Sequence, residues 1–150
     1  MNTILLAEGK LTPSCSKCHI TYAFELNNDS SRLDIYFSYE PKVLDNIQKS
    51  KELICQGIVK FCEGKHEELE QWEKYLPIKN LLTISIDDRD TFRGCAHNQS
   101  EHQHLFITEN NASNGLIQGD ITSGQWKVTI SVHAAVTEIC NYKLHITEGE

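Results

Sequence analysis

The sequence predicts a mainly β protein, an antiparallel β-sandwich of about seven or eight short strands, of the jelly-roll or galactose-binding-like kind. A helical insertion is expected near residues 43–76. Two observations support this fold class. Short segments with apolar residues at every second position recur in both halves of the chain, and turn-forming residues separate them. Between these segments, one stretch changes to the three- and four-residue spacing of helices.

The first third of the chain predicts two strands. Residues 1–14 carry little pattern, and we expect a lead-in or an edge segment there. Residues 20–26 alternate apolar and other side chains, which is the period of a half-buried strand, and residues 33–39 do the same. Because only a short polar turn at residues 27–31 separates them, we expect the two strands to pair as a hairpin.

The period changes after Pro41, where a helical region is predicted. Apolar residues recur at helical spacing over residues 43–61, and Gly64 is expected to end this helix. A second, shorter helix is expected over residues 66–76. Glutamates occupy its first turns, where the helix dipole favours acidic side chains, and Pro77 follows its last residue.

Strand patterning returns in the second half. Alternation or short apolar runs predict strands at residues 82–86, 105–107, 126–132 and 142–146, with a strong turn signal at residues 110–115. The alternation that begins with a tryptophan is the clearest in the chain. Because this tryptophan is in register with the valines and isoleucine that follow, it is expected in the core rather than as a sugar-binding platform.

Size and charge limit the classes of function. The 150 residues are expected to form one domain, residues 1–150. A net charge of −7 repels phosphate backbones, so no nucleic-acid partner is expected. No apolar run is long enough for a membrane helix, and the N-terminus does not have the pattern of a signal peptide. We therefore expect a cytoplasmic protein whose six cysteines are thiols.

Cys15, Cys18 and His19 match the Cys-x-x-Cys-His pattern of haem c attachment, in which two thiolates bond the haem and the histidine binds its iron. Attachment normally follows export, and we find no export signal. The sole methionine is Met1, so a methionine axial ligand is not expected. We interpret the pair as two surface thiols before a strand and expect no haem cofactor.

The same two cysteines could begin a zinc site, since zinc takes four nitrogen or sulfur ligands. No second pair has matching spacing. Cys95, His97, His102 and His104 could complete such a site only through tertiary contact, although on a strand the last two would share one face. The interpretation we favour is a solvated, histidine-rich turn and reduced thiols, with no metal expected.

Asp87, Asp88 and Asp90 resemble part of a calcium loop, and with Arg93 they form the candidate ligand-binding set. The glycine and distal glutamate that a calcium loop needs are missing at the required spacing. We interpret the segment as a polar turn in which aspartates cap backbone N–H groups and pair with Arg89 or Arg93.

A set of short motifs lies along the chain. They run in the order Tyr-Glu-Pro at 39–41, Asn-Leu-Leu at 80–82, Asp-Asp at 87–88, Phe-Arg-Gly at 92–94, Gly115, Gly-Asp-Ile at 119–121 and Gly-Gln-Trp-Lys-Val at 124–128. This order resembles the non-catalytic β-sandwich that precedes the catalytic domain in many PHP-type (polymerase and histidinol phosphatase) metallohydrolases. The resemblance covers about residues 33–146.

The resemblance implies the fold without the activity. In that family a metal-binding domain follows the sandwich and opens with a His-x-His motif. The sequence here ends at Gly149 and Glu150, where that domain would begin. His102 and His104 have the His-x-His form but lie inside the predicted sandwich, so no catalytic role is carried onto them.

The sequence therefore favours a non-catalytic accessory or interaction domain. Its expected partner is a separately encoded hydrolase or a second copy of the chain. One alternative is a metal-binding protein that uses Cys15, Cys18 and the loop from His97 to His104. Another is a carbohydrate- or small-ligand-binding module, which the sandwich architecture alone suggests.

Overall fold

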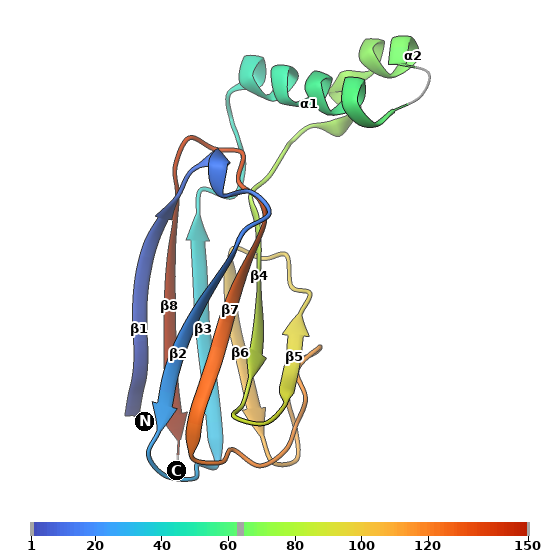
Figure 1. The fold of residues 1–150 in the computed structure, drawn as a ribbon. Coiled ribbons are helices and arrows are strands. Elements are labelled where there is room, and N and C mark those ends of the chain that lie inside the picture. The colour runs from blue at the N-terminus through green and yellow to red at the C-terminus, as the bar shows by residue number, and fades with distance from the viewer. Residues whose placement is uncertain (1, 63–64, 150) are drawn as a thin grey trace.

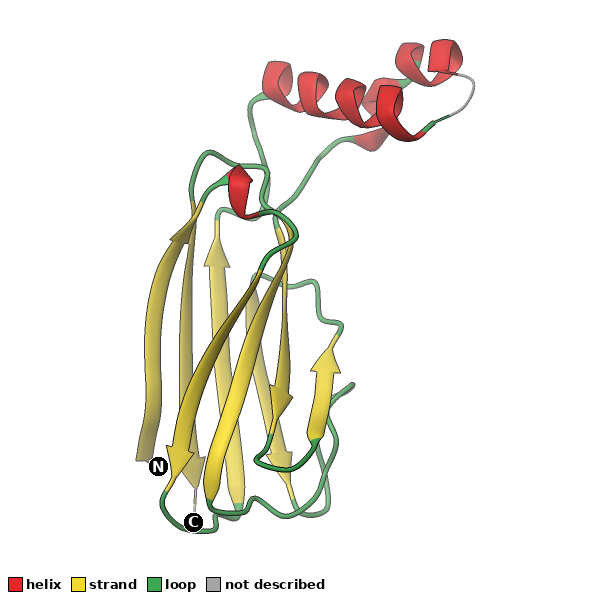
Figure 2. Ribbon diagram, viewed as in Figure 1, coloured by secondary structure: helices red, strands yellow, loops and turns green. Residues whose placement is uncertain are grey.

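Eight strands form two four-stranded antiparallel sheets in the computed structural model, which describes residues 2–62 and 65–149. The sheets face each other as a β-sandwich, so the predicted fold class is confirmed (Figures 1 and 2). The strands are β1 (Asn2–Leu11), β2 (His19–Leu26), β3 (Arg32–Glu40), β4 (Leu81–Asp87), β5 (Phe92–Ala96), β6 (His102–Thr108), β7 (Gly124–Ala134) and β8 (Cys140–Gly149).

The strand order defines a jelly roll. One sheet has the order β1-β8-β3-β6 and the other has the order β2-β7-β4-β5. Strand β1 pairs with β8, β2 with β7, β3 with β6, and β4 with β5. These are the pairs of one long hairpin with its tip between β4 and β5, rolled up so that successive pairs fall in alternate sheets.

The predicted hairpin of residues 20–26 with 33–39 is wrong. Both segments are strands, but β2 and β3 belong to different sheets. The polar turn between them crosses from one sheet to the other, and Ser30 in this turn forms an isolated bridge with Ile121. Alternation shows which face of a strand is buried, and it does not identify the neighbouring strand.

Residues 2–11, expected as a lead-in or an edge segment, form the edge strand β1. Its register shifts between Thr3 and Leu5, which interrupts the alternation and explains the poor sequence signal. Gly9 faces Tyr142 on β8, whose ring lies where a Cβ atom of residue 9 would be. A side chain at residue 9 would therefore displace this ring.

The inner faces of the two sheets supply the core. Trp126 is fully buried, as its register predicts, and Phe24 stacks on it with ring centroids 6.4 Å apart. The hydroxyls of Tyr22 and Tyr142 are 2.6 Å apart and join the two sheets. Burial, and then the hydrogen bond with Tyr22, raises the pKa of Tyr142 above its ordinary value.

The helical insertion consists of α1 (Ile47–Phe61), α2 (Lys65–Glu70) and the 3₁₀ turn η2 (Trp72–Tyr75), together called the helical arm. The first helix begins at Ile47 rather than at residue 43, because Asn46 caps it by accepting from the Lys49 N–H at 3.0 Å. The second predicted helix is two short pieces. Gly64, the expected end of the first helix, lies outside the described residues.

The arm projects from the end of the sandwich where β3 ends and β4 begins (Figure 1). Two antiparallel segments, residues 42–44 and 78–80, form its stem. Val43 and Lys79 form a bridge, the Leu44 N–H donates to the Ile78 carbonyl at 3.1 Å, and the Asn80 N–H donates to the carbonyl of Lys42 at 2.9 Å.

Asn80 anchors the stem to the sandwich. Its buried side chain donates to the Pro41 carbonyl and to the Thr137 hydroxyl, both at 2.8 Å, and accepts from the Val136 N–H at 2.7 Å. Beside it, the Lys42 ammonium donates to the Asn80 carbonyl at 2.8 Å. Polar contacts therefore hold the base of the arm to the sandwich.

The substitution Asn80→Ala is expected to lower the free energy of unfolding by about 2 kcal/mol, because it leaves buried backbone groups without partners. Urea denaturation monitored by circular dichroism measures this loss. Asn110→Ala, at an exposed turn residue, is the matched control and is expected to unfold like the wild-type protein. Equal stability of the two variants would contradict the anchoring role of Asn80.

Candidate functional site

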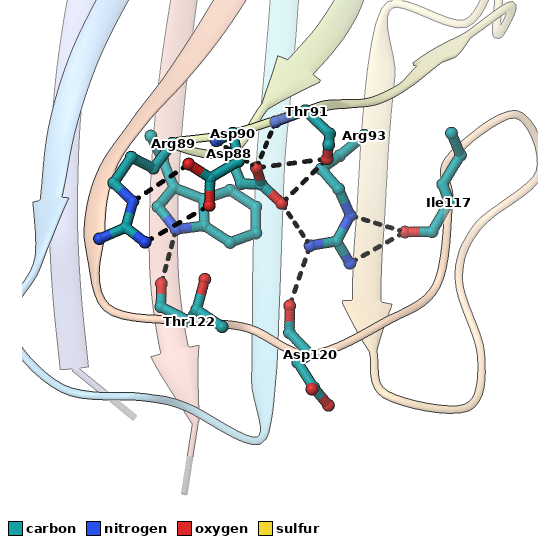
Figure 3. A network of polar contacts seen from close by, with 9 residues as sticks. Asp88, Arg89, Asp90, Thr91, Arg93, Ile117, Asp120 and Thr122 are labelled. Carbon is teal, nitrogen blue, oxygen red and sulfur yellow. Dashed lines mark hydrogen bonds and ion pairs between the residues drawn. The ribbon is translucent and has the colours of Figure 1, made fainter.

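Asp88 organises the turn between β4 and β5 (Figure 3). Its Oδ1 accepts the backbone N–H groups of Asp90 at 2.8 Å and Thr91 at 2.7 Å. Burial raises the pKa of Asp88, but these hydrogen bonds and the pairing with Arg93 outweigh it, so the pKa lies below its ordinary value. The turn has the self-capped geometry expected from the sequence.

Arg93 is a buried clamp beneath this turn. Its guanidinium donates to Asp88 Oδ2 at 3.1 Å, to the Asp120 carbonyl at 2.9 Å, and through two nitrogens to the Ile117 carbonyl at 3.1 and 3.2 Å (Figure 3). It also lies 5.3 Å from the centre of the Trp126 ring. These contacts occupy the guanidinium, so its role is to join the β4–β5 turn to the segment before β7.

The other two candidates at this turn, Asp87 and Asp90, face outward. They line a shallow polar hollow of about 530 Å³ on the outer face of the β2-β7-β4-β5 sheet, together with Lys127 and the edge of Asp88. Arg89 pairs with Asp90 at 3.3 Å, and both side chains are largely exposed. The predicted ligand-binding set is therefore divided between two structural residues and two surface residues.

Strand β6 places His102 and His104 on one outward face, as its alternation requires. They line different hollows: His104 shares one of about 590 Å³ with His97, whereas His102 lines another, which Tyr142 also lines. Within residues 2–62 and 65–149, no three histidine, cysteine, aspartate or glutamate side chains are placed to hold one metal ion. The cysteine pair and the histidines therefore do not converge on a shared site in this structure.

His104 has a partner that the sequence analysis missed. Its Nε2 lies 2.7 Å from Oδ1 of the buried Asp34, and the Arg32 Nε donates to Asp34 Oδ2 at 2.9 Å. The ring of Tyr36 stacks on His104 with centroids 4.3 Å apart. Asp34 lies between apolar neighbours in a strand, and its pairing becomes visible only with the register of β3 and β6.

Burial alone would raise the pKa of Asp34. The hydrogen bonds from Arg32 and His104, in that order, outweigh burial and hold the pKa below its ordinary value. A carboxyl whose pKa is lower in the folded state stabilises the protein above its unfolded-state pKa. That stabilisation is lost as the pH falls through the folded-state pKa.

Cys15 and Cys18 lie in the connection between β1 and β2. Cys15 ends the 3₁₀ turn η1 (Pro13–Cys15), and both thiols are free and half-buried. The ring Nδ1 of His19, the third residue of the haem-like pattern, is 3.0 Å from the Ser131 hydroxyl on β7. By contrast, Cys140 is buried in the core, where desolvation raises its pKa to about 11.

The helical arm exposes several large apolar side chains. The exposed fraction is 57% for Ile47, 52% for Val59, 72% for Phe61 and 41% for Tyr75. Within the arm, α1 packs against α2 and η2 and buries Ile54. The arm therefore has a small apolar contact of its own and an uncovered apolar surface.

The comparisons with known proteins assign no family to this chain. No protein-family model and no curated protein matches the sequence. A crystal structure of a protein from Sulfurospirillum deleyianum is similar with a TM-score of 0.34 and 8% identity, over 97% of this chain and 99% of that protein. Similarity at this level supports no conclusion about function. No helix in the described part of the chain is long and apolar enough to cross a membrane.

Arg93→Met is expected to lower the free energy of unfolding by about 3–5 kcal/mol, because it leaves Asp88 and two carbonyls without their buried partner. Urea denaturation gives the difference from the wild-type protein. Arg89→Met, in the same turn but with its side chain 63% exposed, is the matched control and should change stability by less than about 0.5 kcal/mol. A small loss for Arg93→Met would show that the clamp is dispensable.

Asp34→Asn is expected to lower stability by about 2 kcal/mol near pH 6, where the wild-type carboxylate is ionised and paired. The difference in unfolding free energy between variant and wild type should narrow as the pH falls below about 4. There the carboxyl of the unfolded wild-type chain takes up a proton first, and the folded one follows at its lower pKa. Denaturation curves over this pH range test both expectations. Asp45→Asn, at an exposed residue, is the control. A difference in unfolding free energy between Asp34→Asn and wild type that does not change with pH would contradict the assigned pairing.

Proposed function

We propose that this chain is a non-catalytic interaction domain in the cytoplasm, and that its helical arm binds a protein partner. The exposed apolar side chains of the arm carry the proposal. The 15 residues of α1 span about 22 Å, whereas the 6 residues of α2 span about 9 Å, so α2 is too short to cover the whole of α1. Ile54 and Ile58 are buried, whereas Ile47 and Phe61, at the two ends of α1, are exposed.

The position of the arm supports the same function. It projects beyond the sandwich (Figure 2). Its large apolar side chains are exposed and therefore accessible to another protein. Exposed large apolar side chains that gather on one element are characteristic of interaction sites. The resemblance to the sandwich that accompanies PHP-type metallohydrolases supports an accessory role without catalysis.

Charge favours a second copy of the chain as the partner. The first helix, α1, carries three lysines and one glutamate, whereas α2 and η2 together carry two lysines and four glutamates. Two arms packed antiparallel would place the basic helix of each against the acidic elements of the other. The lysines and glutamates of these helices balance, so the net charge of −7 comes from the rest of the chain. In such a dimer the two acidic sandwiches would lie at opposite ends and would not repel each other closely.

Phe61→Lys is expected to weaken this self-association by at least about tenfold, because loss of a buried aromatic anchor costs more than about 1.4 kcal/mol of binding free energy. Sedimentation velocity over a wide range of protein concentrations measures the dimer. Leu6→Lys is the matched control, since Leu6 is also exposed (67%) but lies on the sandwich.

A wild-type protein that remains monomeric at every concentration would overturn the second copy as partner, as would equal weakening by Leu6→Lys. The separately encoded hydrolase is tested in parallel with a purified PHP-type enzyme. If that enzyme binds the monomer and Phe61→Lys abolishes binding, the arm remains the interaction surface and the hydrolase replaces the second copy.

A further inference from the structure

Residues 15–18 form a tight turn with a cysteine at each end. The Cys18 N–H donates to the Cys15 carbonyl at 3.1 Å. Ser16 has φ −55° and ψ 135°, and Lys17 has φ 69°, which are the angles of a type II turn. Such a turn holds its first and last Cα atoms within about 7 Å. A disulfide usually joins Cα atoms about 4.4–6.8 Å apart, so the two cysteines lie within its range.

Strand β7 and the residue that follows it hold this turn in place. Lys17 has a left-handed backbone conformation that non-glycine residues adopt only when their surroundings impose it. Its N–H donates to the Val132 carbonyl at 2.6 Å, and the Val132 N–H donates to the Cys18 carbonyl at 2.9 Å. The Ser16 hydroxyl donates to the Ala135 carbonyl and accepts from the Ala135 N–H, just after the end of β7. The position of the two cysteines is thus fixed by contacts that do not involve their sulfur atoms.

The two thiols differ in their surroundings. Hydrogen bonding from the backbone and then from the side chain of Thr12 lowers the pKa of Cys15, and Cys18 contributes in the same direction. Thr12 Oγ1 lies 3.8 Å from the sulfur of Cys15. The Cys18 thiol donates to the Cys15 carbonyl. Cys15 is therefore suited to attack first, because the thiolate is the nucleophile in exchange reactions.

We propose that Cys15 and Cys18 form a redox-active dithiol that reduces low-molecular-weight disulfides of the glutathione type and becomes an intramolecular disulfide. The Cys15 thiolate attacks one sulfur of the small disulfide, releases one thiolate and retains the other half as a mixed disulfide. Cys18 loses its proton, attacks the Cys15 sulfur and releases the second thiolate.

The exchange is balanced. One sulfur–sulfur bond breaks in the small molecule and one forms in the protein, and two electrons pass from the dithiol to the small disulfide. The protons that the two cysteines lose are taken up by the two released thiolates. This chemistry takes place in the β1–β2 connection, outside the helical arm, and does not depend on the proposed interaction function.

The test uses the full chain in mixtures of reduced and oxidised glutathione, followed by acid quenching, alkylation and peptide mass spectrometry. The expected product is a disulfide between residues 15 and 18 that dithiothreitol reverses. In Cys18→Ser, Cys15 is expected to accumulate as the glutathione mixed disulfide, at least about tenfold faster than Cys55 in the same sample. Cys95→Ser is the matched control and should leave the 15–18 disulfide unchanged.

The proposal is overturned if no ratio of reduced to oxidised glutathione produces the 15–18 disulfide in the wild-type protein. It is also overturned if Cys15 reacts no faster than Cys55 and Cys62, which are also half-buried thiols. Circular dichroism establishes that each variant is folded. If Cys18→Ser is not folded, the reaction rate of Cys15 in the wild-type protein, compared with the rates of Cys55 and Cys62, still tests the proposal.

Discussion

The inner face of each sheet is apolar and is covered by the other sheet, and the rest of the structure depends on this mutual burial. Residues such as Ile35 on β3, Ile84 on β4 and Trp126 on β7 lose all contact with solvent. The core takes every second position of these strands, so polar side chains are left to the outer faces and to the turns. The apolar contact inside the helical arm, which includes Ile54, is separate from this core.

This division explains how much of the fold could be predicted from the sequence. Alternation at residues 33–39 and 126–132 marks strands with one buried face, and these strands are where they were expected. The same pattern contains no information about partners, so the turn at residues 27–31 was taken for a hairpin although it connects two sheets. Residues 2–11 gave little signal, because an irregular edge strand can form without strict alternation.

Contacts at the candidate sites could likewise be predicted only where the two residues are close in the sequence. The pairing of Asp88 with Arg93 joins residues five positions apart in one turn, so local sequence was sufficient to predict it. The pairing of Asp34 with His104 joins residues 70 positions apart and depends on strand register. Helical spacing predicted the apolar stripe of α1, but the extent to which α2 and η2 leave it uncovered required the three-dimensional structure.

The nested strand pairs have a consequence for the order of folding. The pair β4 and β5 closes a loop of a few residues, whereas β1 and β8 come from opposite ends of the chain. Loop-closure entropy therefore favours zipping from the inner pair outward, since each completed pair shortens the loop that the next pair must close. The stem at Val43 and Lys79 closes the helical arm on itself, so the insertion lengthens the chain without lengthening the path between β3 and β4.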